Sequence, residues 1–581
     1  MLNNIPRPEH PNPQWKRDSF FNLNGEWQFE IDNSATGYER ELHKLDSLKD
    51  KITLPFCPES KLSGVGITDY MKQVWYKKTL CFTEDDLKGN RVIFHIGAAD
   101  FKTTVYVNGV RAGQPHIGGF VSFEYDITKL LNVGENIVTI QCLDDTLHPS
   151  QPAGKQSKKF YSYGCYYTRT TGIWQTVWYE IVPENYIKYA KITPDLNNCS
   201  VSVSFELEGC DDLNAVVLYK GKKVGEASKK QLSVTGNIEI QLSEKHIWDI
   251  GKGELYDIEF TFGKDKVHSY FGLRHIEMKN GKFYLNGRVV FQRLILDQGY
   301  YPDGIMTAPS EEALIKDIEC SLSAGFNGAR LHQKVFEPLF LYHADRLGYI
   351  VWGEYGSWGF DTAEIAYLST FLPDWLSSVK RDYNHPSIIT WCPLNETWDR
   401  VYGNFKHQDN YLIRIIYDQT KLFDPTRPCI DTSGHYHVIT DIFDVHDYEQ
   451  NPETFKNNYD KLYKENVLFD PHSARQKWRG EPVLMSEYGG IGFKLETNDT
   501  GEQKTSWSYG NSTQSYKEFY DRYDGLTTAM LDNPKIIGFC YTQLTDVEQE
   551  VNGLFTYKER APKFDMEIIS RINKKKAAIE E

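Results

Sequence analysis

The sequence predicts a multidomain fold in which two β-sandwiches precede a (β/α)8 barrel. A chain of 581 residues is longer than one hydrophobic core usually supports, so two to four domains are expected. Up to residue 272, short apolar segments alternate with turn residues, which is typical of antiparallel β-structure. From residue 273 onward, strand-like and helix-like segments alternate, which is typical of a parallel barrel.

Residues 1–183 are predicted to form the first sandwich. Runs rich in Val, Ile and aromatic residues are separated by Gly, Asn and Asp, and the "VNG" at 107–109 indicates a hairpin. The runs are GEWQFEI at 25–31, QVWYKKTLCF at 73–82, NRVIFHIGA at 90–98, FKTTVYVNGVRAG at 101–113, NIVTIQCLDD at 136–145 and TVWYEIV at 176–182. Residues 184–272 form a shorter β-region, whose length and strand spacing predict an immunoglobulin-like β-sandwich.

Residues 273–581 are predicted to form the (β/α)8 TIM barrel. The eight candidate strands are 289–296, 327–332, 349–354, 387–394, 429–432, 441–446, 482–486 and 535–541. Most of them are separated by helix-like segments, at 310–325, 338–348, 372–383, 410–423 and 514–532. The linker between the fifth and sixth strands is short, so these two units carry the weakest pattern.

Composition excludes several classes of protein. With 65 basic and 80 acidic residues, the net charge of −15 gives no reason to expect nucleic acid or an anionic membrane as a partner. No run of about eighteen apolar residues occurs, and the N-terminus lacks the apolar core of a secretory signal, so a cytoplasmic protein is expected. The ten cysteines form no C-x-x-C pair, so we expect buried free thiols and no metal site. Homo-oligomers are common among such chains, and one is possible here.

The ends of the predicted barrel strands carry an unusual number of polar and aromatic residues. Barrel enzymes place their chemistry at the carboxyl ends of the strands. The residues found there are Asp297, Arg330, His332, Trp352, Glu354, Asn395, Glu396, Trp398, His446, Tyr448, Glu487, Tyr541 and Gln543. Taken singly, each of them has an ordinary structural role, as an ion-pair partner or a core residue. Their joint occurrence on one rim predicts a functional site.

Two of these residues, Glu396 and Glu487, suggest paired-carboxylate chemistry. They end the fourth and seventh predicted strands, which face each other across the mouth of a closed barrel. Retaining glycosidases need two carboxyl groups about 5 to 5.5 Å apart, one to attack the anomeric carbon and one to transfer a proton. The neighbouring aromatic residues suit the faces of sugar rings. We therefore expect an oligosaccharide or glycoside as substrate.

The segments around both glutamates resemble glycoside hydrolase family 2, the β-galactosidase, β-glucuronidase and β-mannosidase family. "YNHPSIITWCPLNE" at 383–396 resembles its acid/base signature, and "EPVLMSEYGG" at 481–490 resembles its nucleophile segment. "FNLNGEWQF" at 21–29, "FHIGAADFKTTVYVNG" at 94–109 and "TGIWQTVWYE" at 171–180 look like its N-terminal jelly-roll β-sandwich. The resemblance covers essentially the whole chain and implies a jelly roll, an immunoglobulin-like sandwich and a catalytic barrel.

The resemblance also implies roles for the site residues. Glu396 becomes the general acid/base, Asn395 the partner of the sugar 2-hydroxyl, and Glu487 the nucleophile, with no metal or organic cofactor. From the chemistry of these roles, we expect the apolar surroundings of Glu396 to raise its pKa, and Tyr448 or Arg330 to keep Glu487 ionised.

The remaining rim residues are expected to hold the terminal sugar. Asp297, His332 and Glu354 would hydrogen-bond it from the first three strand ends, and Trp352 or Trp398 would stack on it.

The sugar is harder to predict than the reaction. Glucuronidases of the family carry an Asn-x-Lys element after the eighth strand, and Asn552 lacks the lysine two positions on, which disfavours a glucuronidase. The segments 294–304 and 352–359 resemble a subgroup associated with galactose- or arabinose-type sugars. The expected function is a retaining, exo-acting, β-galactosidase-like hydrolase. An arabinofuranosidase or galactofuranosidase is the alternative within the family, and a non-catalytic carbohydrate-binding protein is the alternative of another class.

Overall fold

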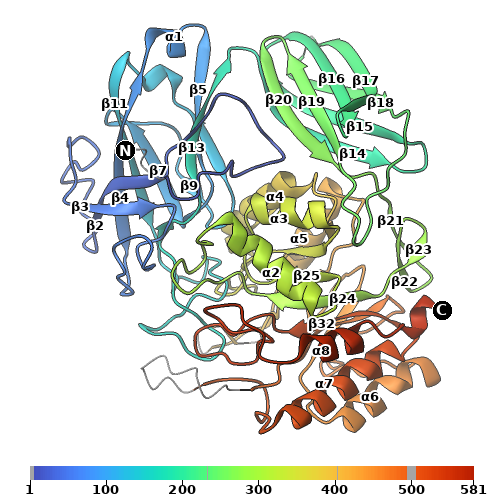
Figure 1. The fold of residues 1–581 in the computed structure, drawn as a ribbon. Helices are drawn as coiled ribbons and strands as arrows, with labels where there is room; N and C mark the ends of the chain where they lie inside the picture. Colours follow the sequence, from blue (N-terminus) through green and yellow to red (C-terminus); the bar gives the residue numbers. More distant parts are fainter. Residues whose placement is uncertain (1–4, 232, 399, 402–403, 494–505) are drawn as a thin grey trace.

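Three separately packed units make up the molecule. The computed structural model describes residues 5–231, 233–398, 400–401, 404–493 and 506–581. Figure 1 shows two β-sandwiches, in blue to cyan and in green, lying side by side above a barrel coloured yellow to red. Each unit has its own cluster of buried apolar side chains. The predicted architecture is confirmed, whereas the limits 1–183, 184–272 and 273–581 stay a proposal.

The first sandwich packs two antiparallel sheets around Trp27, Tyr76, Phe94 and Ile140. One sheet has the order β1(Phe20–Asn22), β13(Val177–Pro183), β5(Asn90–Ile96), β10(Phe123–Asp126). The other has the order β3(Asp50–Leu54), β2(Gly25–Ile31), β4(Gln73–Phe82), β11(Gly134–Leu143), β7(Lys102–Val107), β8(Val110–Arg111), with β9(His116–Ile117) also on β7. β6(Ala99–Asp100) pairs with β12(Gly172–Ile173), and α1(Glu84–Leu87) precedes β5.

The second sandwich forms because its strands alternate apolar and polar residues. Along β15(Ser200–Glu208), Val201, Val203, Phe205 and Leu207 are buried, whereas the residues between Val201 and Leu207 that alternate with them are exposed. β15 lies between β14(Tyr186–Asp195) and β18(Thr235–Gln241). The facing sheet has the order β17(Lys222–Gln231), β16(Asp211–Tyr219), β19(Tyr256–Phe262), β20(Asp265–Phe271).

A small antiparallel sheet leads from this sandwich into the barrel. It consists of β21(Ile276–Lys279), β22(Lys282–Leu285) and β23(Arg288–Val289).

The barrel is built from parallel strands that are buried on both faces. Seven of them form one sheet in the order β27(Ile388–Cys392), β26(Ile350–Glu354), β25(Gly328–Leu331), β24(Gln292–Asp297), β32(Ile536–Thr542), β31(Val483–Gly489), β30(Phe443–Asp447). A pair of two-residue strands, β28(Arg400–Val401) and β29(Asn404–Phe405), follows β27.

The predicted fifth strand, 429–432, is not a regular ladder strand. Isolated parallel bridges from Cys429 to Trp391 and from Ser433 to Asn395 attach this segment to the β27 side. The carboxylate of Asp431 accepts hydrogen bonds from the backbone N–H groups of Thr432, Val438 and Ile439. Such local side-chain contacts compete with the strand ladder, so the expectation of eight full strands is wrong at this position.

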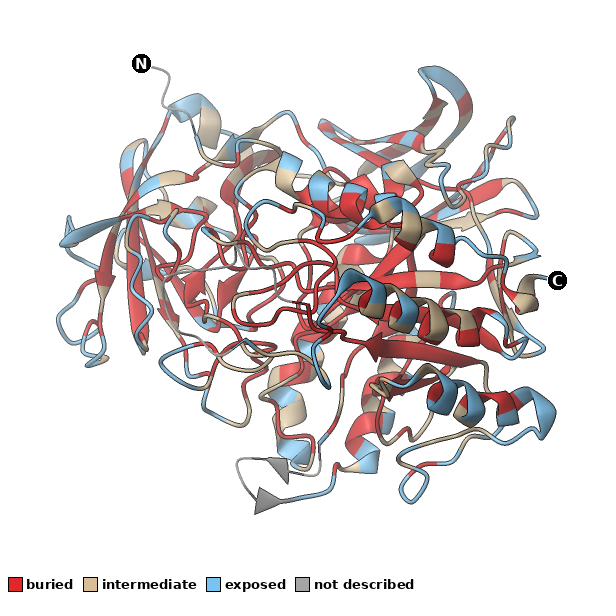
Figure 2. Ribbon diagram, turned by 60° about the horizontal axis from the view of Figure 1, so that its bottom comes forward, coloured by how far each residue is buried: buried red, intermediate tan, exposed pale blue. Residues whose placement is uncertain are grey.

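Helices cover the outside of the barrel, with buried faces toward the strands and exposed faces outward (Figure 2). They are α2(Glu311–Ser323), α3(Pro338–Leu347), α4(Leu368–Asp382), α5(Asn410–Phe423), α6(Pro452–Lys464), α7(Tyr516–Leu531) and α8(Met566–Asn573). In α5, Asp409 caps the first turn, and Leu412, Ile413 and Ile416 are buried on one face.

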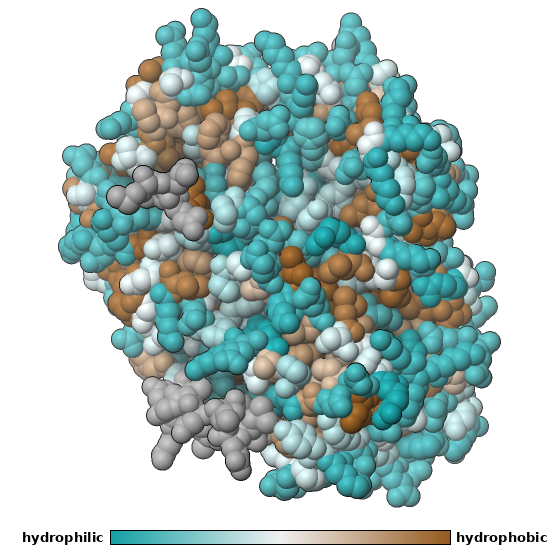
Figure 3. Space-filling model, viewed as in Figure 1, coloured by the Kyte–Doolittle hydropathy of each residue, from teal (hydrophilic) through white to brown (hydrophobic). Residues whose placement is uncertain are grey.

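Two further features concern helix length and the polarity of the surface. In the described part of the chain, no helix has the length and apolarity needed to cross a membrane. The face drawn in Figure 3 is mostly hydrophilic with small separate apolar patches, and a homo-oligomer stays a prediction.

The first sandwich reaches the barrel through its longest connection, the 144–171 loop between β11 and β12. The N–H of Ala153 donates to the carbonyl of Trp358 at 2.7 Å, and the N–H of Gly154 donates to Gly356 at 3.1 Å. Gly154 has a φ of +59°, and a Cβ there would lie 2.4 Å from the carbonyl oxygen of Gln333. Only glycine allows so close an approach, so the loop is fixed against the segment that follows β26.

Arg17 ties the two sandwiches together. Its guanidinium contacts Glu180 of β13 at 2.8 Å and Asp265 of β20 at 2.9 Å, and its side chain is 5% exposed.

We expect Arg17→Met to lower the free energy of unfolding by about 3 to 5 kcal/mol, because two buried carboxylates lose their cation. Calorimetric melting measures this. Lys188→Met, which removes an exposed ion pair with Glu208, is the control and should change stability by less than about 1 kcal/mol. Equal melting curves for the two variants would contradict the assignment.

Candidate active site

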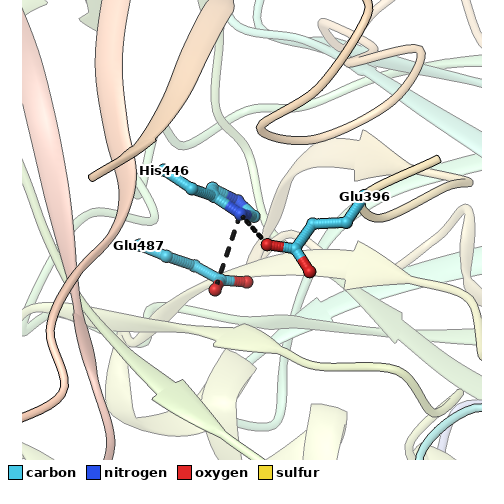
Figure 4. A group of neighbouring side chains, drawn as sticks. All are labelled: Glu396, His446 and Glu487. Atoms are coloured by element: carbon cyan, nitrogen blue, oxygen red, sulfur yellow. Dashed lines mark hydrogen bonds and ion pairs between the residues drawn. The ribbon is translucent and has the colours of Figure 1, made fainter. Parts of the chain in front are cut away.

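Two glutamates from different strands meet at the mouth of the barrel. Glu396 follows β27, Glu487 lies on β31, and His446 of β30 lies between them (Figure 4). One carboxylate oxygen of each glutamate and one ring nitrogen of His446 all lie within 4.8 Å of one another. His446 Nδ1 is 2.8 Å from Glu396 Oε1 and 3.5 Å from Glu487 Oε2. The structure therefore brings together the two acids that the strand pattern predicts as a pair.

The backbone of Glu396 adopts a conformation that is rare for this residue type. Its φ is +43°, in the left-handed region. A hydrogen bond from its N–H to the carbonyl of Ser433 at 3.0 Å and another from the Trp398 N–H to its own carbonyl at 2.9 Å hold this conformation. A strained acid held by two backbone contacts is a feature that functional sites share.

Glu487 is surrounded by hydrogen-bond donors. Arg330 Nη1 donates to its Oε1 at 3.0 Å, and the hydroxyl of Tyr448 donates to its Oε2. Both donors stabilise a charged carboxylate. These are the two residues from which the sequence predicts such a contact.

Arg330 contacts several residues of the site, which come from different strand ends. Its side chain is fully buried and also donates to Glu354 Oε2 at 2.5 Å and to Asn395 Oδ1 at 2.6 Å. The other oxygen of Glu354 accepts from the Gln333 N–H at 3.0 Å and lies 2.9 Å from His332 Nδ1. Because both of its oxygens are engaged, Glu354 supports Arg330, and the structure lends no support to its expected contact with a sugar.

The expectation of a raised pKa for Glu396 is wrong. Burial alone would raise its pKa, but the hydrogen bond from His446 and the charges of His446 and His435 outweigh burial and lower the pKa to about 2. Burial would likewise lower the pKa of His446, whereas the charges of Glu487 and Glu396 raise it. The sequence shows the apolar residues near Glu396 but not the imidazole that contacts it.

Several predicted rim residues do not contact the two acids. Asp297 is buried and accepts a hydrogen bond from the Gly299 N–H at 2.9 Å. Gln543 accepts from Gln298 at 2.6 Å. Trp352 is completely buried, and its indole N–H donates to Gln292 at 2.9 Å, so it has no open face for a sugar.

Tyr541 points away from the barrel mouth. Its ring packs edge-on against Tyr488 and against Tyr523 of α7, so it lies between the sheet and the helices. Its neighbour Thr542 lies on the inner side, 3.2 Å from the Tyr448 hydroxyl. Successive residues of a strand face opposite sides, and the sequence of a strand buried on both faces does not reveal which residue faces inward.

A cleft opens beside Glu396. Its volume is about 100 Å³, and Trp358, Asn395, Glu396 and Trp398 are among the lining residues. Trp398 is 52% exposed and packs edge-on against His435 at 4.6 Å between ring centroids. Of the predicted aromatic residues, Trp398 is thus the one that stands at the entrance.

Four further residues near the acids come from loops, so a search of strand ends misses them. Trp358 donates from its indole N–H to the Asn395 carbonyl at 3.1 Å. Lys155 Nζ lies 3.9 Å above the Trp358 ring. The ring of Tyr509 stacks on Tyr448 at 3.5 Å, and Glu550 follows β32. Lys155 belongs to the first sandwich, and no signal in the barrel sequence points to it.

Glu396, His446 and Glu487 offer three ligand atoms at a spacing that a metal ion accepts. The surrounding charges oppose one, because Arg330 already lies 3.0 Å from Glu487 and is fully buried. The arrangement suits proton transfer and nucleophilic attack better than metal binding.

Comparison with known proteins identifies the family of the chain. The family model described as "Glycosyl hydrolases family 2, TIM barrel domain" matches residues 276–573, and "Glycosyl hydrolases family 2" matches 185–274. A putative beta-glucuronidase of Formosa agariphila is 27% identical over 457 residues, 74% of this chain but only 52% of that protein. A beta-glucuronidase of Paenibacillus borealis is 25% identical and covers 86% of this chain and 88% of its own. The fold of Ruminococcus gnavus beta-glucuronidase matches with a TM-score of 0.78 at 16% identity, over 96% of this chain and 98% of that one.

The Arg330–Glu354 pair predicts how stability depends on pH. Burial alone would raise the pKa of Glu354, but the charges of Arg330 and His332 lower it from 4.5 to about 2. The stabilisation is therefore complete above pH 4.5 and is lost as the pH falls toward 2. We expect Glu354→Gln to lower the free energy of unfolding by on the order of 3 kcal/mol at neutral pH. We also expect it to flatten the acid limb, which is the fall of that free energy as the pH decreases below 4.5. Urea unfolding at stepped pH values measures both effects.

Glu226→Gln serves as the control, because Glu226 is exposed and forms an exposed ion pair with Lys223. It should leave the acid limb unchanged. An acid limb of Glu354→Gln as steep as that of the wild type would contradict the assignment.

Proposed function

Because the chain belongs to glycoside hydrolase family 2 and is a glycoside hydrolase, we propose that it releases terminal sugars with retention of anomeric configuration. One observation carries this: carboxylate oxygens of Glu396 and Glu487 lie within 4.8 Å of each other, together with His446. Retaining enzymes have their carboxyl groups about 5 to 5.5 Å apart, whereas inverting enzymes leave about 6.5 to 9.5 Å for a water molecule. The spacing supports direct attack by one acid.

In the first step, Glu487 attacks the anomeric carbon. Its oxygen forms a bond to that carbon, the bond to the leaving oxygen breaks, and Glu396 donates its proton to the leaving oxygen. Arg330 and Tyr448 orient the carboxylate of Glu487. In the second step, Glu396 takes a proton from water, the water oxygen bonds to the anomeric carbon, and Glu487 leaves.

Glu396 must carry a proton before the first step. Burial favours the protonated acid, but the hydrogen bond from His446 and the charges of His446, His435 and Lys155 together favour the carboxylate more strongly. A sugar bound between the two acids would separate Glu396 from His446, which removes the largest influence that lowers the pKa of Glu396 and so raises it. Asn395 Nδ2 makes no hydrogen bond with any described residue and donates to the sugar 2-hydroxyl.

We propose β-galactosidase-like, exo-acting specificity. The 144–171 loop, which lies against the segment after β26 beside the site, supports binding of one terminal sugar. The resemblance of residues 294–304 and 352–359 to galactose- or arabinose-type enzymes supports an uncharged sugar, and it equally allows an arabinofuranoside or galactofuranoside. The relatives named above carry the name beta-glucuronidase, so a glucuronide belongs in every substrate panel. A purely carbohydrate-binding protein would have no chemical need for both acids.

Variants of the two glutamates test the mechanism. With a panel of nitrophenyl glycosides, Glu487→Gln should reduce turnover of the best substrate by more than about 10⁴-fold, because no covalent intermediate forms. Glu396→Gln should cost about 10² to 10⁴-fold, and less for a dinitrophenyl leaving group that needs no protonation. Proton NMR of the first product released from a β-glycoside should show the β-anomer.

The matched control is Glu548→Gln, a glutamate whose Oε1 accepts from the Thr168 N–H, which an amide oxygen also does. It should retain wild-type rates. Full activity of Glu487→Gln, or an initial α-anomer released from a β-glycoside, would remove Glu487 from the role of nucleophile.

A further inference from the structure

A buried lysine from the first sandwich lies in the active site of the barrel. Lys155 is 4% exposed, and its Nζ lies 3.9 Å above the centre of the Trp358 ring. That indole donates to the carbonyl of Asn395, next to Glu396. Among the described residues, no hydrogen bond or salt bridge ends on Lys155 Nζ. An ammonium group held on an aromatic face, with its donors unused, is available to a ligand.

A third carboxylate lies on the same side of the site. Glu550 is 1% exposed, and it accepts hydrogen bonds from the Tyr167 hydroxyl at 2.5 Å and from Asn552 Nδ2 at 3.0 Å. Tyr167 also donates from its backbone N–H to the carbonyl of Lys155 at 2.8 Å. The loop that carries Lys155 is thus fastened to Glu550.

The charge of Lys155 acts on all three acids. Burial alone would lower the pKa of Lys155, but Cys165 and the carboxylates of Glu550, Glu487 and Glu396 raise it. Burial raises the pKa of Glu550, and Glu487 raises it further, whereas Lys155 opposes both. The two groups are therefore close enough to Glu487 for their charges to interact with it.

The balance of charges favours a sugar without a carboxylate. Arg330 is already shared between Glu354 and Glu487, and Lys155 is a further cation whose charge acts on Glu550 and Glu396. A uronate would bring a further negative charge into this group and would be repelled by the carboxylates of Glu550, Glu396 and Glu487. Sugar hydroxyls both donate and accept, so they satisfy a carboxylate and an ammonium group together.

We propose that Lys155 and Glu550 form a sugar-binding pair that recognises hydroxyls of an uncharged terminal sugar and excludes uronosides. The proposal rests on the proposed function and names the substrate class of that site. It makes the first sandwich a direct contributor to specificity. It also separates this chain in substrate from the relatives named beta-glucuronidase.

Kinetics of Glu550→Gln test the pair. The wild type should prefer nitrophenyl β-galactopyranoside, β-galactofuranoside or α-arabinofuranoside to nitrophenyl β-glucuronide. Glu550→Gln should lower kcat/KM for the best uncharged substrate by about 10 to 100-fold. It should also lower the ratio of kcat/KM for that substrate to kcat/KM for the glucuronide by about 100-fold. A wild type that prefers the glucuronide, or an unchanged ratio in the variant, would overturn the proposal.

Lys155→Met should raise KM for the best uncharged substrate by about 10-fold or more, and Lys155→Arg, which keeps the charge, should retain more of the binding. Lys159→Met is the matched control, because Lys159 lies 4.0 Å above the Tyr163 ring in the same loop but is exposed. Equal KM values for Lys155→Met and Lys159→Met would overturn the role of Lys155. If Lys155→Met does not fold, Lys155→Gln gives the same comparison.

Binding without turnover separates this inference from the proposed function. Calorimetric titration with D-galactonolactone and D-glucarolactone should show binding of the first alone to the wild type. Tighter binding of D-glucarolactone would overturn the inference even if the enzyme is a retaining hydrolase. If no glycoside in the panel is hydrolysed, the proposed function fails, and the titration still decides between an uncharged and a charged ligand.

Discussion

The site depends on one buried cation, the guanidinium of Arg330. Its partners Glu354, Asn395 and Glu487 come from three different strand ends, and a buried guanidinium is tolerated only when it is paired. The barrel must therefore close in its native register before this charge is satisfied. The same contacts fix one oxygen of Glu487 and the amide of Asn395, so folding and preorganisation of the site rest on one group. The role of Glu354 is to pair with Arg330 and to hold its guanidinium in place.

His446 gives the two acids different environments. It lies 2.8 Å from Glu396 and 3.5 Å from Glu487, whereas Glu487 also has Arg330 and Tyr448 as donors. Glu487 therefore has stabilising partners besides the imidazole, whereas the imidazole is the principal partner of Glu396. Different environments for two neighbouring carboxyl groups are what the proposed acid/base and nucleophilic roles require.

The sequence predicts the chemistry better than the binding surface, for physical reasons. Strand order and the rule that barrel chemistry lies at strand ends are enough to bring Glu396 and Glu487 together, and the resemblance in their segments adds the family. Trp352 and Tyr541 are misplaced because a strand buried on both faces shows no alternation, so inward and outward positions look alike. The fifth strand fails because Asp431 binds neighbouring backbone groups. Lys155 and Trp358 lie on loops, whose positions depend on tertiary contacts that no local pattern encodes.

These loops explain why the sandwiches and the barrel form one functional unit. Gly154 permits the 144–171 loop to touch the segment after β26, and Gln549 donates to the carbonyls of Gly164 and Tyr166 in the same loop. The loop is thus held at both ends of its contact with the barrel, by the connections that follow the third and the eighth strands. Specificity can therefore be set by the first sandwich while the two acids of the barrel stay unchanged, which separates the choice of sugar from the chemistry of bond cleavage.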